Sequence, residues 1–74
     1  MTIHAITGTT NGISSCTMQS VDNEPNAILY VTHGDSEVLA ALNLCRKLVE
    51  AGYDPQTPIS IPVLPGVKTL ERAT

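Results

Sequence analysis

The first part of the chain alternates apolar and polar positions on either side of an Asn-Gly pair. Residues 2–9 and 13–21 flank Asn11 and Gly12, a pair that favours the positive φ angles of a two-residue type I′ turn. The pattern predicts a β-hairpin in which paired position numbers add up to 23. One face, the expected core face, carries Ile3, Ala5, Thr7, Cys16 and Met18. The other face is only partly polar and carries His4, Ile6, Ile13, Thr17, Gln19 and Val21.

A short apolar run and an amphipathic segment follow the hairpin. The run from Ala27 to Val31 predicts a third strand, in the centre of the sheet. Residues 36–51 predict a helix with Asp35 or Ser36 as its N-cap and Gly52 just beyond its end. Helical periodicity places on the expected buried face Val38, Ala41, Leu42, Leu44, Cys45, Leu48 and Val49. The expected solvent side carries Ser36, Leu39, Asn43, Arg46, Lys47 and Glu50.

Prolines punctuate the segment after the helix. Ile59, Ile61 and Val63 alternate with other residues, which predicts a short strand, and Pro62 places it at a sheet edge because proline has no N–H to donate. Residues 67–73 are candidates for one further helical turn, and the end of the chain, residues 66–74, is expected to fray. The element order predicts one small α+β domain over residues 1–74: a three-stranded antiparallel meander, one helix and a short C-terminal edge strand.

The composition limits how this fold can be stabilised. The chain has 74 residues, of which 42% are hydrophobic, but Tyr30 and Tyr53 are its only aromatic residues. The core is therefore aliphatic and thin, and a single helix covers only one face of the sheet. Because Ile6, Ile13 and Val21 lie on the other face, we expect a second copy of the chain or another protein to cover them.

Charge and cysteine content argue against several classes of protein. All the Lys and Arg residues lie after position 45 and the net charge is −3, so no basic stripe is present for direct binding of DNA or RNA. Cys16 and Cys45 are too few for a secreted disulfide scaffold and are expected to be reduced and buried. No stretch has the length of a membrane span or the pattern of a signal peptide. We therefore expect a cytoplasmic protein that is not bound to a membrane.

Two groups of residues are candidates for a ligand or metal site. His33-Gly34-Asp35-Ser36 precede the helix, where α/β proteins bind phosphate. A simple helix cap explains the same residues, and Asp35 with Glu37 would repel a phosphate. The zinc-type ligands lack the close spacing of a preformed site; they are His4, His33, Cys16 and Cys45. No pair of a nucleophile and a base stands out, so we expect no metal, cofactor or catalytic residue.

The region around the helix resembles a known family. Gly34-Asp35-Ser36-Glu37, Ala40-Ala41, Gly52 and Pro58 resemble HicB-like antitoxin domains, in which three strands lead through a Gly-Asp-Thr or Gly-Asp-Ser turn into an Ala-rich helix and a last short strand. The resemblance covers residues 27–60. The family has a Pro-Leu-Pro-Gly-type segment before the third strand, whereas Leu64-Pro65-Gly66 follows the helix here. The resemblance implies a non-catalytic, dimerising relative of the RNase H fold that binds and blocks another protein.

The leading hypothesis from the sequence is a small non-enzymatic module, dimeric or larger, that inhibits or regulates another macromolecule. Acidic proteins of this size and role are common in phages and mobile elements. Its interface with itself or a partner is expected on the sheet at Ile6, Ile13 and Val21, and on the helix at Leu39, Asn43, Arg46 and Glu50. The alternative is a protein that binds a small molecule or nucleotide at a site between two subunits.

Overall fold

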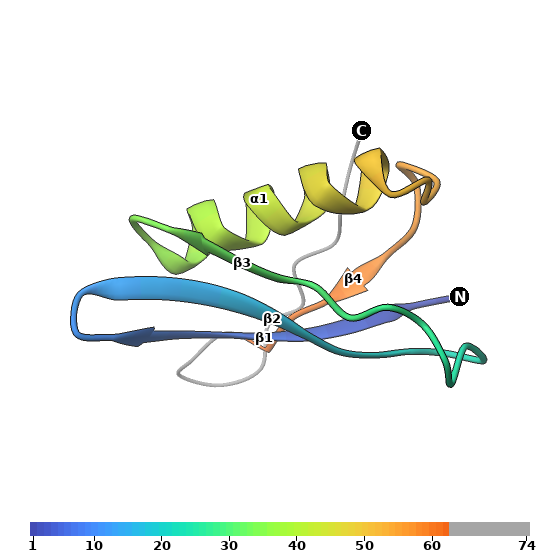
Figure 1. Ribbon diagram of the computed structural model, residues 1–74, viewed down its shortest axis with the longest axis horizontal. Helices are drawn as coiled ribbons and strands as arrows, with labels where there is room; N and C mark the ends of the chain where they lie inside the picture. Colours follow the sequence, from blue (N-terminus) through green and yellow to red (C-terminus); the bar gives the residue numbers. More distant parts are fainter. Residues whose placement is uncertain (63–74) are drawn as a thin grey trace.

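The computed structural model describes residues 1–62 and confirms the predicted order of elements. Residues 63–74, including Val63, the candidate helical turn at 67–73 and the expected fraying end at 66–74, lie outside the described residues. The strands form one mixed sheet in the order β3-β2-β1-β4, antiparallel from β1 to β3, with β4 parallel to β1. The elements are β1 (Ile3–Thr10), β2 (Ile13–Val21), β3 (Val31–Gly34), α1 (Glu37–Glu50) and β4 (Ile59–Ser60) (Figure 1).

The β1–β2 hairpin has the predicted turn but changes register near its open end. Asn11 and Gly12 have φ angles of 53° and 78°, as a type I′ turn requires. The predicted pairing holds from the turn to Ala5, and a bulge between His4 and Ala5 then shifts it, so that Ile3 pairs with Val21. Our placement of Val21 on the uncovered face is therefore wrong. The extra residue in β2 reverses the alternation and places Val21 in the core, 5% exposed.

The third strand differs from the prediction in its first residue and in its location within the sheet. It begins at Val31, not Ala27, and it lies at an edge of the sheet because β4 adds beside β1 and leaves the hairpin strands in the centre. Side-chain bonding sets its position more than hydrophobicity does: Thr32 Oγ1 donates to the Ala40 carbonyl at 2.7 Å. The apolar run before it keeps one ladder-like bond, from the Met18 N–H to the Tyr30 carbonyl at 3.0 Å.

The helix has the predicted ends. Ser36 is the N-cap, and its Oγ accepts a bond from the Leu39 N–H at 3.2 Å. At the other end, Gly52 has a φ of 103°, and the Tyr53 N–H donates to the Leu48 carbonyl at 3.0 Å. This is the pattern of a Schellman motif, which satisfies the last carbonyls of a helix. Both ends are therefore fixed by residues within the local sequence.

The face that α1 turns toward the sheet is rotated from the predicted one. The buried helix residues are Ala40, Ala41, Leu44 and Leu48. Val38, Leu42 and Val49, which we expected in the core, are 63%, 49% and 41% exposed. The rotation follows from the contacts with β3, because the Thr32–Ala40 bond and a 2.7 Å bond from Asn43 Nδ2 to the His33 carbonyl hold that side of the helix against the strand. Asn43 therefore faces β3 and not open solvent.

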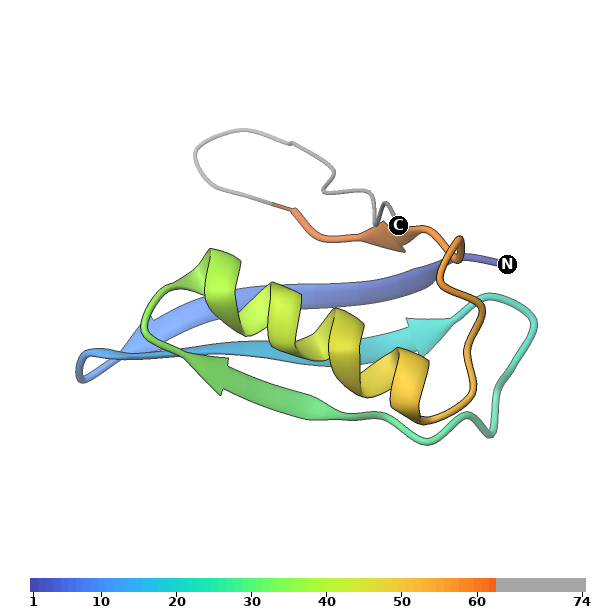
Figure 2. The same ribbon diagram turned by 90° about the horizontal axis from the view of Figure 1, so that it is seen from above.

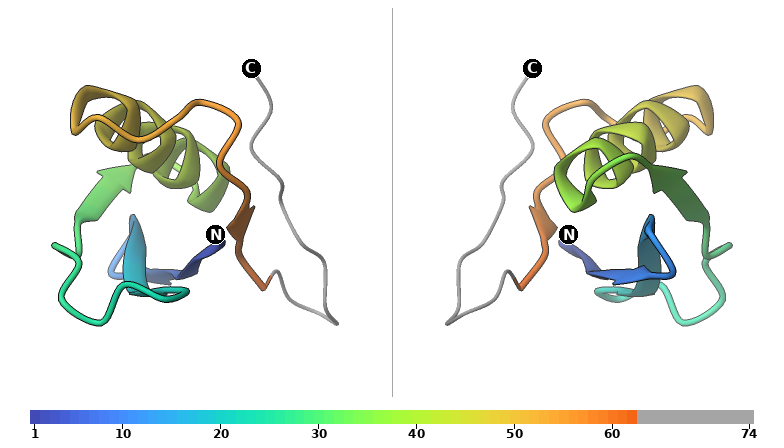
Figure 3. Two further views of the ribbon diagram at one scale, coloured as in Figure 1. Left: turned by 90° about the vertical axis from the view of Figure 1, so that its right-hand side faces the viewer. Right: turned by 90° about the vertical axis from the view of Figure 1, so that its left-hand side faces the viewer.

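Helix and sheet form two layers with the core between them. α1 runs diagonally across one face of the sheet, over β1 and β2 and beside β3 (Figure 2), and the end-on views show that no other described element lies on either face (Figure 3). We call the sheet surface opposite α1 the open face. No helix within residues 1–62 is long and apolar enough to cross a membrane. The buried core consists of Ile3, Ala5, Cys16, Met18, Val21, Ala40, Ala41, Leu44, Leu48, Ile59 and Ile61.

Candidate functional site

The turn from His33 to Ser36, a candidate ligand site, joins β3 to α1 and is occupied by contacts within the chain. Ser36 caps the helix, and the His33 carbonyl accepts the amide of Asn43. Only glycine fits at position 34, because the helix backbone lies so close to it that a Cβ there would be 2.7 Å from the Ala40 backbone nitrogen. These contacts support the helix-cap interpretation of the four residues, and nothing in their geometry adds to the ligand interpretation.

A hydroxyl cluster beside this turn was not predicted from the sequence. Thr7 Oγ1 donates to Glu37 Oε1 at 2.7 Å, and Thr9 Oγ1 lies 3.3 Å from Glu37 Oε2 and 2.7 Å from Ser14 Oγ. The carboxylate of the first helical turn thus anchors the hairpin to the helix N-terminus. From the sequence, we considered Glu37 only for its interaction with the helix dipole. The contact of β1 with the helix joins residues far apart in the sequence, so no local pattern predicts it.

The exposed aliphatic residues of α1 form one surface, which we call the helix strip: Val38, Leu39, Leu42 and Val49. Val38, Leu42 and Val49 fall within about 40° of one another around the helix, and Leu39 lies beside them. Arg46 and Glu50 are exposed at the border of the strip, where they can supply polar contacts to a partner. Because Asn43 and Lys47 face β3 and Tyr30, the strip is turned away from that strand.

Only some of the residues of the predicted helix patch are exposed in the structure. Leu39, Arg46 and Glu50 are exposed as expected, whereas Asn43 is engaged with His33 and three aliphatic residues take its place. The missed signal was the repetition of aliphatic residues around more than half of the helix. One stripe of such a helix faces the core, and the other is left for a second contact.

The open face carries the other predicted interface residues. Ile6, Ile13 and Val31 are 42%, 60% and 53% exposed. Pairing places Ile6, Thr17 and Val31 in one row across three strands, because Thr17 pairs with both of the other residues. The next row joins Gly8, Ser15 and His33. The open face is thus a partly apolar surface with small residues beside large ones, and Val21 is no part of it.

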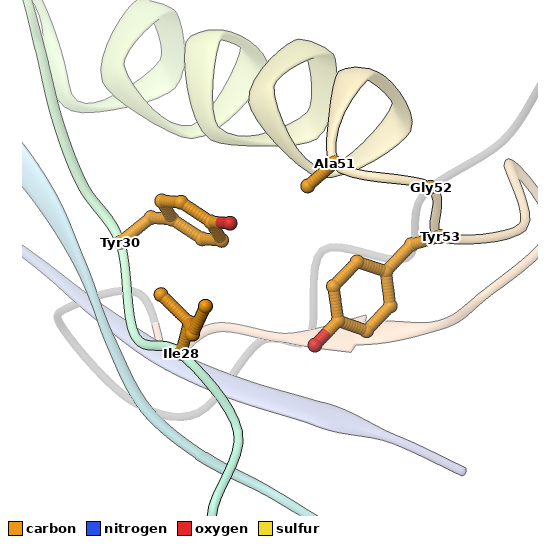
Figure 4. A pocket seen from close by; sticks show the side chains of 5 residues that line it. All are labelled: Ile28, Tyr30, Ala51, Gly52 and Tyr53. Atoms are coloured by element: carbon orange, nitrogen blue, oxygen red, sulfur yellow. The ribbon is translucent and has the colours of Figure 1, made fainter.

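A small pocket brings together the two aromatic residues of the chain. The tyrosine pocket has a volume of about 310 Å³ and is lined by Ile28, Tyr30, Ala51, Gly52 and Tyr53 (Figure 4). Lys47 Nζ lies 5.6 Å from the centre of the Tyr30 ring, so a cation covers one face of that side chain. No local pattern predicts the pocket, although the rarity of aromatic residues could have directed attention to this pair.

Groups capable of chemistry are scattered through the structure. Cys16 and Cys45 are not joined in a disulfide; Cys16 is buried as expected, whereas Cys45 is only half-buried. Burial, with a smaller effect of Cys45, raises the pKa of the Cys16 thiol to about 11. A thiol with such a pKa is a poor nucleophile at neutral pH. His4 Nε2 lies 2.8 Å from Asp22 Oδ1 at the surface. Within residues 1–62, no three His, Cys, Asp or Glu side chains are grouped so that they could hold a metal ion.

Comparison of the chain with models of protein families, with curated proteins and with solved structures finds no match. The resemblance to HicB-like domains therefore stays a prediction.

Proposed function

We propose that the protein is a small non-enzymatic interaction module that binds another protein through the helix strip and thereby inhibits or regulates it. The observation that carries this proposal is the helix strip itself, with four aliphatic side chains exposed on one side of a helix whose ends are both capped. Exposed aliphatic side chains that are contiguous and bordered by polar groups are typical of interaction sites. The HicB-like resemblance suggests a specific form of this function, the blocking of a target protein.

The anchoring of the helix at both ends supports this use. The N-cap bond of Ser36, the Glu37 contacts to the hairpin and the Schellman motif at Gly52 hold α1 in place without using the strip residues. A partner with an apolar groove would therefore meet a preformed helix, which lowers the entropy cost of binding. Arg46 and Glu50 would then set orientation at the edge of the contact.

The test is affinity capture from a lysate of the source cells, followed by quantitative mass spectrometry. The tagged protein is expected to enrich one specific protein, and Leu42→Glu is expected to reduce that enrichment by about tenfold, since a buried charge is costly at an interface. Leu29→Glu is the matched control because Leu29 is the same residue type, is 48% exposed against 49% for Leu42, and lies outside the strip. Circular dichroism should show that both variants fold. Equal enrichment by the two variants, or no specific protein at all, would contradict the proposal.

A second candidate function, the binding of a small molecule, is favoured by the tyrosine pocket. Its volume of about 310 Å³ is at the lower end for ligand sites, and its two rings offer stacking surfaces. The pocket belongs to one chain, unlike the subunit interface that we expected for such a site. A thermal-shift screen with metabolites and nucleotides tests it: a stabilising compound whose effect is lost in Tyr53→Ala but kept in Leu42→Glu would support this function, and no shift would exclude it for that panel.

A further inference from the structure

The open face has an unusual charge distribution. Strands β1, β2 and β3 contain no Asp, Glu, Lys or Arg residue. Every such residue within residues 1–62 lies in α1 or in a connecting segment. The titratable side chains of the open face are the imidazoles of His4, which is paired with Asp22, and His33. Beyond these imidazoles and the Asp22 carboxylate at the border, the strands offer a charged partner no group that would steer or orient it.

The same neutrality makes the open face complementary to itself. When two copies of one surface meet across a two-fold axis, each residue near the axis faces its own equivalent, and like charges there would repel. This face has none in its strands, and it carries the exposed side chains of Ile6, Ile13 and Val31. A second copy of the chain is therefore the occupant that the composition favours.

The shape of the open face also suits a second copy. Ile6 and Val31 stand on either side of Thr17, while Gly8 and Ser15 form a low row beside them. A Cβ added at Gly8 would have no heavy atom of residues 1–62 within 4 Å, so the described part of the chain leaves space above that position. A two-fold axis between the two rows brings Ile6 of each copy over Gly8 of the other, with the sheets about 10 Å apart, as in a β-sandwich.

We propose that two copies of the protein associate through their open faces into a β-sandwich dimer with both helices on the outside. This inference extends the proposed function, because such a dimer presents two helix strips on opposite outer surfaces and can engage a partner at two points. It does not depend on the identity of that partner. Its test uses the purified protein alone, so its failure is distinct from a failure of partner capture.

Sedimentation equilibrium of the full-length chain over roughly 1 to 500 µM is the first measurement. We expect a mass twice the monomer's 7.8 kDa at the upper end of this range. Ile6→Glu and Ile6→Lys should each be monomeric, since like charges meet near the axis. An equimolar mixture of the two variants should recover the dimer with an affinity at least about tenfold above that of either variant alone. Recovery on mixing also shows that both variants fold.

Two further variants separate this arrangement from others. Gly8→Val fills the space above the strand, where no atom of residues 1–62 opposes the new side chain, and should weaken the dimer about tenfold while the sheet stays intact. Val38→Glu, on the helix strip, should leave the dimer unchanged. Dissociation by Val38→Glu with no effect of Ile6→Glu would show that the copies meet through their helices. A monomer of 7.8 kDa at every concentration would show that no second copy covers the open face. Either result overturns the proposal.

Discussion

The covered side of the sheet and the open face are built from the same strands, but only the covered side has a second layer, α1, packed against it. On the covered side, residues such as Ile3 and Cys16 are completely buried beneath α1. On the open face, Ile6 pairs with Thr17, one residue along from Ala5 and Met18 in the core, yet remains exposed. Aliphatic side chains are thus present on both sides, and the presence of a second layer decides which of them stabilise the monomer.

The two sides also differ in how closely the backbone is approached. The end of β3 lies so near to the first turn of α1 that Gly34 leaves no room for a side chain, whereas none of the described residues lies above Gly8. Ala40 and Ala41 are the small residues that permit this approach. The covered side is therefore a completed interface within the chain, whereas the open face is the surface that the proposed dimer would bury.

The largest expected effect comes from removing a core side chain of the helix. Leu44→Ala should lower the free energy of unfolding by about 2–5 kcal/mol, because the side chain is fully buried and its loss leaves a cavity. Leu42→Ala, at a half-exposed position two residues earlier, should change it by less than about 1 kcal/mol. Urea denaturation at one fixed protein concentration, followed by circular dichroism, measures both. Similar losses would mean that the helix is rotated from the orientation described here.

A pair of glycine variants compares the backbone of the two sides. Gly34→Ala should destabilise the fold by about 1–3 kcal/mol, since its Cβ would lie 2.7 Å from the Ala40 nitrogen and the helix would have to shift. Gly8→Ala adds the same methyl group where no atom of the described residues opposes it. It should leave stability unchanged or raise it by up to about 1 kcal/mol, because alanine restricts the unfolded chain. Melting temperatures test this when both glycine variants are made in the Ile6→Glu background, which is expected to be monomeric, so that no second copy opposes the new methyl group. An equal loss at Gly8 would then show that its surface is covered within the chain.

The elements could be predicted from the sequence because their signals are local. Asn11-Gly12 specifies its own turn, and Ser36 and Gly52 specify the ends of the helix through bonds to residues a few positions away. The sequence predicted less accurately which side of the sheet and which face of the helix each side chain occupies. One bulged residue in β2 moved Val21 from one side of the sheet to the other, and bonds from Thr32 and Asn43 rotated the helix. These contacts join distant parts of the chain, so no window of sequence contains them.

The same distinction applies to the candidate site. Exposure of Ile6 and Ile13 follows from alternation next to a well-defined turn, and both positions were predicted. The tyrosine pocket and the bonds of Glu37 to Thr7 and Thr9 depend on how β1, β3 and α1 meet, and both were missed. Which side chains are exposed on a single helix or strand can be predicted from periodicity. A site formed between several elements can be predicted only when their packing is known.

The smallest expected effect concerns the thiol at the centre of the covered side. Burial beneath α1, with a smaller effect of Cys45, raises the pKa of Cys16 from 9.0 to about 11. The folded protein thus holds this proton at a pH where the unfolded chain has released it, so the associated stability is complete below pH 9 and is lost as the pH rises toward 11. The loss at about pH 10 should be about 1 kcal/mol.

Urea denaturation at about pH 8 and pH 10 measures this loss. Cys16→Ala is the control, because this variant keeps every other group that titrates in the range and lacks the thiol. The wild-type protein should lose more stability than the variant over this interval, even though the variant is less stable throughout. An equal loss in both proteins would mean that Cys16 is accessible to water, and that the covered side is less closed than the contrast with the open face requires.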